Sequence, residues 1–119
     1  MNSQKLIEVM KKAKILMHEN WAGTLTEDHE GFHFAYEEDY LKNENAEPIS
    51  LTLPLKTVKY SSKILFPFFD GLIPEGWLLD IAAKNWKLDT RDRMSILLVT
   101  CRDCIGAVSV HQLKSNDDE

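Results

Sequence analysis

The segment Phe66–Trp77, which reads FPFFDGLIPEGW, divides the chain into two parts of different character. Before it, short apolar runs alternate with polar residues, and Phe32, Phe34 and Tyr36 show a clear period of two. This period predicts β-strands. After it, apolar residues recur at helical spacing, and Pro74 suits the first turn of a helix, where a backbone N–H would have no helical partner. Strands, then helices, then one last strand predict an α+β fold, a mostly antiparallel sheet with two or three helices packed on it.

The periods and the turn residues also predict where each element lies. We expect a helix over residues 3–12, strands over 14–18, 21–26, 32–36 and 49–55, helices over 74–86 and about 90–100, and a final strand over 105–110. Turns are expected at Glu19-Asn20 and Asp28–Gly31, and Asp89 or Thr90 is expected to cap the second long helix. Residues 1–13 are interpreted as an N-terminal helix extension, 14–114 as one domain, and 115–119 as an acidic tail.

The composition is typical of a soluble globular protein with one domain. The chain has 119 residues and is 44% apolar, which suits a single core without disulfides. Its net charge of −5 argues against direct nucleic-acid binding, which requires a basic surface. No apolar run approaches the roughly 20 residues of a membrane span. Lysines interrupt the first apolar stretch, so we expect no signal peptide and a cytoplasmic protein.

The acidic residues are concentrated in one part of the chain. Eight residues from Glu27 to Glu47 are acidic and one, Lys42, is basic. Such a run forms either a solvated face of the molecule or an electrostatic surface for a partner. Both interpretations stay open on the sequence alone.

The segment Phe66–Trp77 carries more apolar side chains than an ordinary connecting loop. It either folds under the core or presents these side chains to another molecule. On a helical wheel, the side expected to face the core comprises Leu78, Leu79, Ala82, Ala83 and Trp86. Trp77 lies nearly opposite this stripe, beside Ile81. A tryptophan in that position is either covered by the loop, over Phe68 or Phe69, or left for a partner.

The motifs for catalysis are weak. Asp80 and Asn85 have the spacing of a kinase catalytic loop, but they fall inside a predicted helix, and no glycine-rich phosphate loop accompanies them. Cys101 and Cys104 form a C-x-x-C at a predicted helix C-terminus, where the dipole raises a thiol pKa, so buried reduced thiols are expected. A zinc site needs two more ligands, and His111 is the one candidate. We therefore predict no enzyme activity, no metal and no cofactor, with a thiol redox protein as a remote alternative.

Five blocks of the chain together resemble the N-terminal subdomain of HipA-type kinases. They are AGTL (22–25), FHFAYEEDYL (32–41), ISLTLPL (49–55), FFDGLIPEGW (68–77) and DCIGAVSV (103–110). They occur in the family's order and span about residues 21–110. HipA kinases are toxins of bacterial toxin–antitoxin systems, and in them a kinase core follows this subdomain. A freestanding copy resembles HipS of the split HipB–HipS–HipT systems.

The resemblance implies a partner rather than a reaction. It implies an antitoxin that binds a HipT-like serine/threonine kinase in trans, with a HipB-like DNA-binding protein as a further candidate member of the complex. The alternative is a structural or activating subunit that completes the kinase. The predicted partner-binding residues are Phe69, Asp70, Leu72, Ile73, Glu75, Trp77 and Ile81. Asp70 and Glu75 also have local explanations, in a turn with Gly71 and in the first helical turn.

Overall fold

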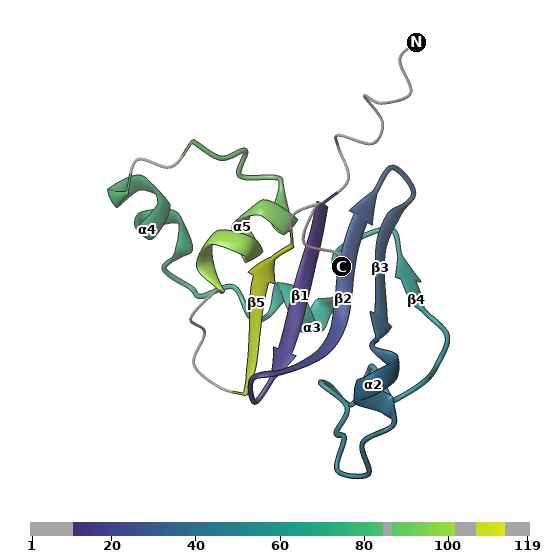
Figure 1. Cartoon of the computed structure of the whole chain (residues 1–119). Helices are drawn as coiled ribbons and strands as arrows, with labels where there is room; N and C mark the ends of the chain where they lie inside the picture. Colours follow the sequence, from purple (N-terminus) through teal and green to yellow (C-terminus); the bar gives the residue numbers. More distant parts are fainter. Residues whose placement is uncertain (1–10, 85–86, 102–106, 114–119) are drawn as a thin grey trace.

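The protein is built on one antiparallel sheet with short helices around it (Figure 1). The computed structural model describes residues 11–84, 87–101 and 107–113. The sheet has five strands in the order β4-β3-β2-β1-β5. The strands are β1 Lys11–Met17, β2 Asn20–Asp28, β3 Gly31–Tyr36, β4 Tyr60–Ser62 and β5 Val108–Gln112. The described helices are α2 Glu38–Leu41, α3 Pro67–Asp70, α4 Trp77–Ala83 and α5 Arg93–Thr100. The predicted α+β fold is confirmed.

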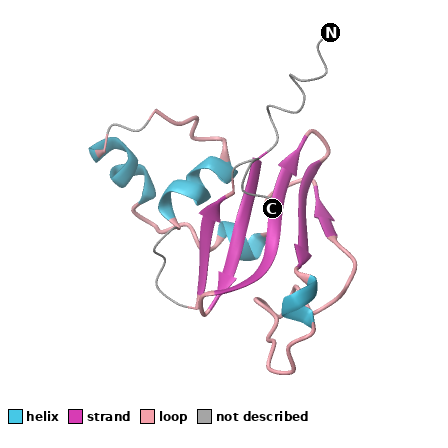
Figure 2. Cartoon of the chain, viewed as in Figure 1, coloured by secondary structure: helices cyan, strands magenta, loops and turns pink. Residues whose placement is uncertain are grey.

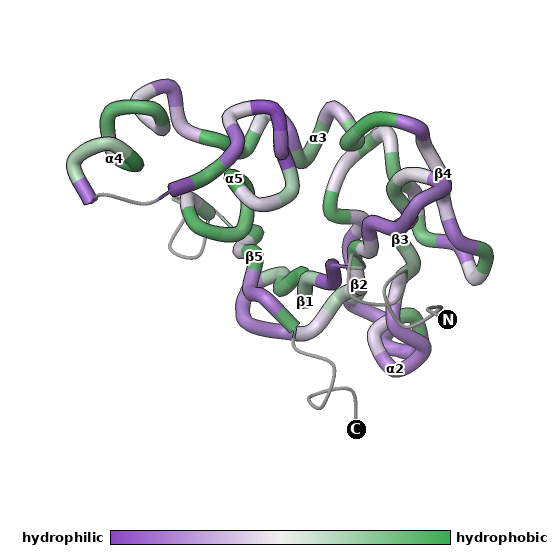
Figure 3. The backbone as a smooth tube through the Cα atoms, turned by 90° about the horizontal axis from the view of Figure 1, so that it is seen from above, coloured by the Kyte–Doolittle hydropathy of each residue, from purple (hydrophilic) through white to green (hydrophobic). Residues whose placement is uncertain are grey.

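One face of the sheet forms the core. Along β3 the burial alternates, with Phe32, Phe34 and Tyr36 buried as their period of two predicts. Leu25 of β2 pairs with Phe34 of β3 and with Ala13 of β1. Ile15 lies two residues after Ala13, and therefore on the same face, and it pairs with Val110 of β5. Helices α3 and α5 cover that face (Figures 2 and 3). The other face is partly open, as is common for antiparallel sheets.

The first hairpin turns one residue earlier than the sequence pattern indicated. His18 and Glu19 form the turn, with φ values of 51° and 72°. Positive φ at both central residues is the geometry of the two-residue turns that match the twist of paired strands. The second turn follows Asp28, as predicted, and Gly31 has a φ of 130°, which glycine adopts at little cost.

Residues 49–55 do not form the predicted strand. Ser50 and Leu53 make one isolated bridge, and Leu51 between them is 93% exposed. The backbone groups that would bond to a neighbouring strand bond to Tyr36 instead. Its hydroxyl accepts from the Ile49 N–H at 3.0 Å and donates to the Leu53 carbonyl. The segment is therefore a turn held under the edge of the sheet, with Ile49 and Leu53 buried and Leu51 outside.

Several element boundaries differ from the predicted ones. Helix α4 begins at Trp77 rather than Pro74, and β5 begins at Val108. Helix α5 is capped by Asp92 instead of Asp89 or Thr90. Residues 11–13, assigned to the N-terminal extension, belong to β1, where Ala13 is fully buried. The short elements α2, α3 and β4 were not predicted.

Some predicted features lie outside the described residues. They are residues 3–10 of the helix predicted over 3–12, whose residues 11 and 12 lie in β1, together with Asn85, Trp86, Cys104 and the tail 115–119. Among the helices that the structure does describe, none has the length and apolar character to cross a bilayer.

Candidate functional site

The first half of the segment Phe66–Trp77 belongs to the core. Pro67 opens α3, and Phe69 on that helix is fully buried. Its ring centroid lies 5.6 Å from that of Phe34 and 6.1 Å from that of Phe66. Phe69 was predicted to contact a partner, but in the folded chain its ring is fully enclosed by the core and is not at the surface. Its position in a one-turn helix under the sheet could not be read from the spacing.

The middle of the segment is held close to the core. Leu72 and Ile73 are half-buried and pack against the core cluster. The Cys101 thiol, which is fully buried at the end of α5, donates to the Leu72 carbonyl at 3.2 Å. Glu75 is exposed. This part of the segment therefore serves mainly as a connection between α3 and α4 that packs against the core.

Helix α4 is oriented opposite to the prediction from the helical wheel. Ile81 is 6% exposed, whereas Leu78 is 54% and Leu79 is 77% exposed, and Ala82 and Ala83 are exposed as well. Figure 3 shows this apolar helix at the periphery, away from the sheet. The wheel correctly separates two sides of the helix, but it does not say which side meets the rest of the protein. Ile81, predicted to bind a partner, is instead the buried anchor of α4.

Trp77, Asp70 and Arg93 meet at one place. Trp77 is half-buried at the start of α4. The guanidinium carbon of Arg93, the first residue of α5, lies 5.6 Å from the centroid of the Trp77 ring. The Nε of the same guanidinium donates to Asp70 Oδ1 at 2.7 Å. The sequence pattern leaves two alternatives for Trp77, a ring covered by Phe68 or Phe69 and a ring left for a partner. Within the described chain, the ring contacts an arginine from another helix.

Arg93 was not predicted as a site residue. It lies 23 positions from Asp70 along the chain, and neither helical nor strand periodicity connects them. The usable signal was indirect, since charged residues concentrate at the start of α5, where Asp92 caps the helix. Contacts between separate helices of this kind become visible only when the elements are packed.

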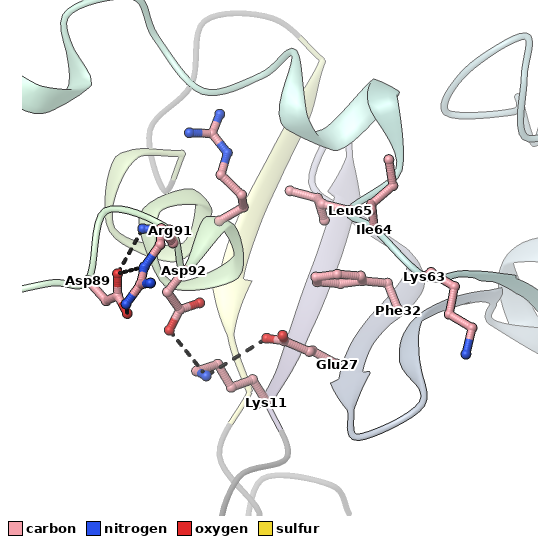
Figure 4. Close-up of a pocket in the computed structure, with 10 residues that line it drawn as sticks. Lys11, Glu27, Phe32, Lys63, Ile64, Leu65, Asp89, Arg91 and Asp92 are labelled. Atoms are coloured by element: carbon pink, nitrogen blue, oxygen red, sulfur yellow. Dashed lines mark hydrogen bonds and ion pairs between the residues drawn. The ribbon is translucent and has the colours of Figure 1, made fainter.

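A cleft of about 610 Å³ opens next to Arg93 (Figure 4). It lies between the ends of β1 and β2, the chain before α3 and the start of α5. Its walls are made by Lys11, Glu27, Phe32, Lys63, Ile64, Leu65, Asp89, Arg91, Asp92 and Arg93. Figure 4 shows Lys11 between two carboxylates, and its Nζ lies 3.8 Å from Glu27 Oε1 and 3.4 Å from Asp92 Oδ2.

The two carboxylates of the cleft have opposite pKa shifts. Burial raises the pKa of Glu27, and the nearby charge of Lys11 only partly offsets this. Burial would also raise the pKa of Asp92, but hydrogen bonds from the Ser95 hydroxyl and N–H, together with Lys11, lower it overall. Asp92 accepts from the Ser95 N–H at 3.1 Å and from its hydroxyl at 2.8 Å. These contacts explain Asp92 as a helix cap, and no catalytic pair is required.

One group of possible metal ligands occurs among the described residues. Ligand atoms of Asp28, Glu30 and His33 lie within 4.8 Å of one another. Asp28 Oδ1 already accepts from the Glu30 N–H at 2.9 Å, and His33 Nε2 lies 3.2 Å from it. The group is therefore explained as a hydrogen-bonded turn at the partly open side of the sheet.

Comparison with known proteins identifies relatives over most of the chain. The model of the HipA N-terminal domain family matches residues 13–111. A solved structure described as the N-terminal domain of HipA toxin has a TM-score of 0.69 and 32% sequence identity, and the match covers 88% of this chain and 94% of that one.

Two curated relatives differ greatly in size. An uncharacterized protein of Haemophilus influenzae is 35% identical over 107 residues, which are 90% of this chain and 97% of that protein. A protein of Sinorhizobium fredii named "Putative kinase Y4mE" is 43% identical over 98 residues, which are 82% of this chain and 23% of that protein. The same domain therefore matches a small protein almost completely and a small part of a much longer one.

Proposed function

This chain belongs to the HipA N-terminal domain family, and we propose that it is a noncatalytic antitoxin that binds and restrains a HipT-like serine/threonine kinase in trans. The family is related to toxin–antitoxin systems through HipA, the toxin named in the solved structure. The proposed contact surface is the half-buried ring of Trp77 together with the outer side of α4, Leu78 and Leu79. We refer to these three residues as the α4 surface. The proposed complex is cytoplasmic.

The observation that carries this proposal is the exposed apolar character of the α4 surface. A helix of seven residues that leaves Leu78 and Leu79 more than half exposed gains little from the core on that side. Contiguous exposed apolar side chains of this kind mark interaction sites. An adjacent tryptophan adds large apolar area and an N–H donor, and tryptophan is enriched among the residues that dominate binding.

One of the relatives supports a kinase as the partner. In the Sinorhizobium fredii relative, the matching part is 23% of a protein whose name contains the word kinase. We propose that in such a protein this domain packs against the remaining polypeptide. In the proposed complex, this chain supplies the same domain to a separate kinase molecule.

The proposed mechanism of restraint is steric. Trp77 acts as an aromatic anchor that docks near or in the active-site cleft of the kinase, while Leu78 and Leu79 add apolar contact around it. This chain contributes no reacting group to the step. A single buried tryptophan can account for more than about 2 kcal/mol of binding, or roughly thirtyfold in affinity.

The experiment compares Trp77→Ala with the wild type in binding and kinase assays with a purified HipT-like kinase. We expect binding at least roughly thirtyfold weaker and a matching loss of inhibition. Trp77→Phe, which retains an aromatic ring, should recover part of both. If Trp77→Ala unfolds at the wild-type temperature and still binds and inhibits like the wild type, the proposed role of Trp77 as an anchor is wrong.

The second candidate function is a structural or activating subunit. The Sinorhizobium fredii relative favours it, because there the domain forms part of a larger protein named as a kinase. Co-expression separates the two roles. Rescue of growth from a toxic kinase supports the antitoxin, and greater toxicity supports an activating subunit.

A HipB-like DNA-binding protein is proposed as a third member of the complex. Size-exclusion chromatography of the three co-expressed proteins tests this. Co-elution of all three would support it, and separation of the DNA-binding protein from the other two would contradict it.

A further inference from the structure

Arg93 makes two contacts that meet on one guanidinium group. Its Nε donates to Asp70 Oδ1 at 2.7 Å, and its guanidinium carbon lies 5.6 Å from the centroid of the Trp77 ring. Asp70 ends α3, Trp77 begins α4 and Arg93 begins α5. One side chain therefore connects three helices at the base of the α4 surface.

Helix α4 starts with a side-chain contact between Trp77 and Arg93. It is seven residues long, and isolated helices of that length are not stable in water. Ile81 is its buried apolar anchor, near the end of the helix, while Leu78 and Leu79 face outward. The start of the helix, where Trp77 lies, is the part that contacts Arg93.

Arginine is suited to this position in a way that lysine is not. Its guanidinium is planar, so it can lie over an aromatic ring while an N–H in the same plane bonds to a carboxylate. A lysine ammonium retains the charge but lacks the planar group that makes both contacts at once. About one third of the Arg93 side chain is exposed. The guanidinium at its end contacts the Asp70 carboxylate and the Trp77 ring at the same time.

We infer that Arg93 is a positioning residue, which holds the Trp77 ring and the first turn of α4 in the orientation that the partner recognises. Asp70 acts through it by fixing the guanidinium. This inference deepens the proposed function and rests on it. It also gives Asp70 a role that differs from both sequence-based interpretations, a partner contact and a local turn with Gly71, because here Asp70 holds Arg93.

Arg91 provides a matched control for Arg93. It is also an arginine, lies two residues earlier and has a carboxylate partner, since its Nε lies 3.2 Å from Asp89 Oδ1. Its side chain is 89% exposed, and its contacts in the structure are with Asp89. Replacing it changes the net charge as replacing Arg93 does, without touching the described contact with Trp77.

The first experiment measures the environment of Trp77 in the full chain without a partner. Trp21→Phe and Trp86→Phe leave Trp77 as the fluorescent tryptophan. We expect Arg93→Met to increase quenching of Trp77 by acrylamide and Arg91→Met to leave it unchanged. A second background with Trp21 alone, where Lys14 Nζ lies 4.6 Å from the ring centroid, should show no change with Arg93→Met. Unchanged quenching of Trp77, or an equal effect of both methionine variants, would overturn the inference.

The second experiment measures binding to the purified HipT-like kinase. We expect Arg93→Met to weaken binding about twofold to fivefold, the range that an exposed cation–aromatic contact gives. Arg93→Lys should recover part of the loss, and it serves as the test if the methionine variant does not fold. Asp70→Asn should add little to Arg93→Met in the double variant, because the two residues act as one unit. Additive losses would contradict this.

The two proposals fail in different ways. If Trp77→Ala weakens kinase binding and Arg93→Met does not, the proposed function stands and the positioning role of Arg93 is wrong. If Trp77→Ala binds like the wild type, the α4 surface is not the contact with the kinase. Arg93 then has no role in recognition either.

Discussion

The ring of Phe69 lies 5.6 Å from the ring of Phe34, centroid to centroid, and the two planes are tilted by 55°. Phe69 comes from a one-turn helix and Phe34 from the middle of a strand 35 positions earlier. This contact places the start of the segment Phe66–Trp77 in the core. The same segment reaches the surface a few residues later, where Pro74, Glu75 and Gly76 are exposed, and Trp77 after them is half-buried. A single apolar stretch therefore has a part that belongs to the core and a part whose apolar side chains are only half-buried.

Replacing Phe69 should destabilise the fold. Phe69→Ala removes a fully buried ring and leaves a cavity, so we expect the free energy of unfolding to fall by about 3–5 kcal/mol. Phe68→Ala is the control, because Phe68 is half-buried, and its loss should be clearly smaller. Urea denaturation measures both. Equal losses for the two variants would show that Phe69 is not the core residue of this pair.

Replacing Leu79 should weaken binding to the partner and leave the stability of the fold almost unchanged. Leu79 is 77% exposed on the α4 surface, so Leu79→Gln should change stability by less than about 0.5 kcal/mol. Its affinity for the HipT-like kinase should fall by about fivefold, as for a residue worth roughly 1 kcal/mol at an interface. Leu51→Gln is the control, since Leu51 is 93% exposed on a different loop. A loss of affinity with Leu51→Gln and none with Leu79→Gln would move the interface to that loop.

Removing the cap of α5 should lower stability in a pH-dependent way. Asp92→Ala should reduce the free energy of unfolding by about 1–2 kcal/mol at neutral pH, while Asp92→Ser should keep most of the cap. Because the folded-state pKa of Asp92 is lowered from 3.8, its contribution is present above that pH and is lost as the pH falls through the folded-state value. Chemical denaturation across acidic pH measures this. A difference between Asp92→Ala and wild type that grows toward low pH would contradict the assignment.

Removing the charge of Glu27 should have the opposite pH dependence. Glu27 lies on the core side of β2, its Oε1 is buried without a hydrogen-bond partner, and burial raises its pKa above 4.5. The folded state therefore binds the Glu27 proton more tightly than the unfolded state does. Ionisation costs stability as the pH rises from 4.5 through the folded-state pKa.

We therefore expect Glu27→Gln to gain stability relative to the wild type over that pH interval. Thermal unfolding at a series of pH values checks it, with Glu30→Gln on the exposed turn as a control for lost charge. If the Glu27→Gln variant is instead less stable than the wild type, by a margin that widens as the pH rises, the ion pair with Lys11 outweighs burial.

Part of the candidate site could be predicted and part could not. The sequence predicts a contact role for Trp77 because it lies off the apolar stripe of its helix, and for Asp70 because it lies in the same segment. Phe69 and Ile81 were selected with them and are buried. Arg93 was missed because its contacts join residues 16 and 23 positions apart, beyond the reach of any local period.

The sequence by itself determined the features that depend on neighbours along the chain. The period of two made β3 a strand with Phe32, Phe34 and Tyr36 on its core face, and helical spacing made α5 a helix with Met94 and Leu97 inward. The order of these elements was enough for the α+β class, and the five blocks were enough for the family.

Only the tertiary structure decided which side of α4 meets the protein. An amphipathic pattern states which residues share a face, but a face is buried only if another element is there to cover it. Helix α4 lies at the periphery, with Ile81 buried and Leu79 exposed. Likewise, residues 49–55 alternate like a strand but form a turn, because the Tyr36 hydroxyl takes their backbone hydrogen bonds. In both cases the local pattern is not enough, because the outcome depends on what the tertiary structure places beside the segment.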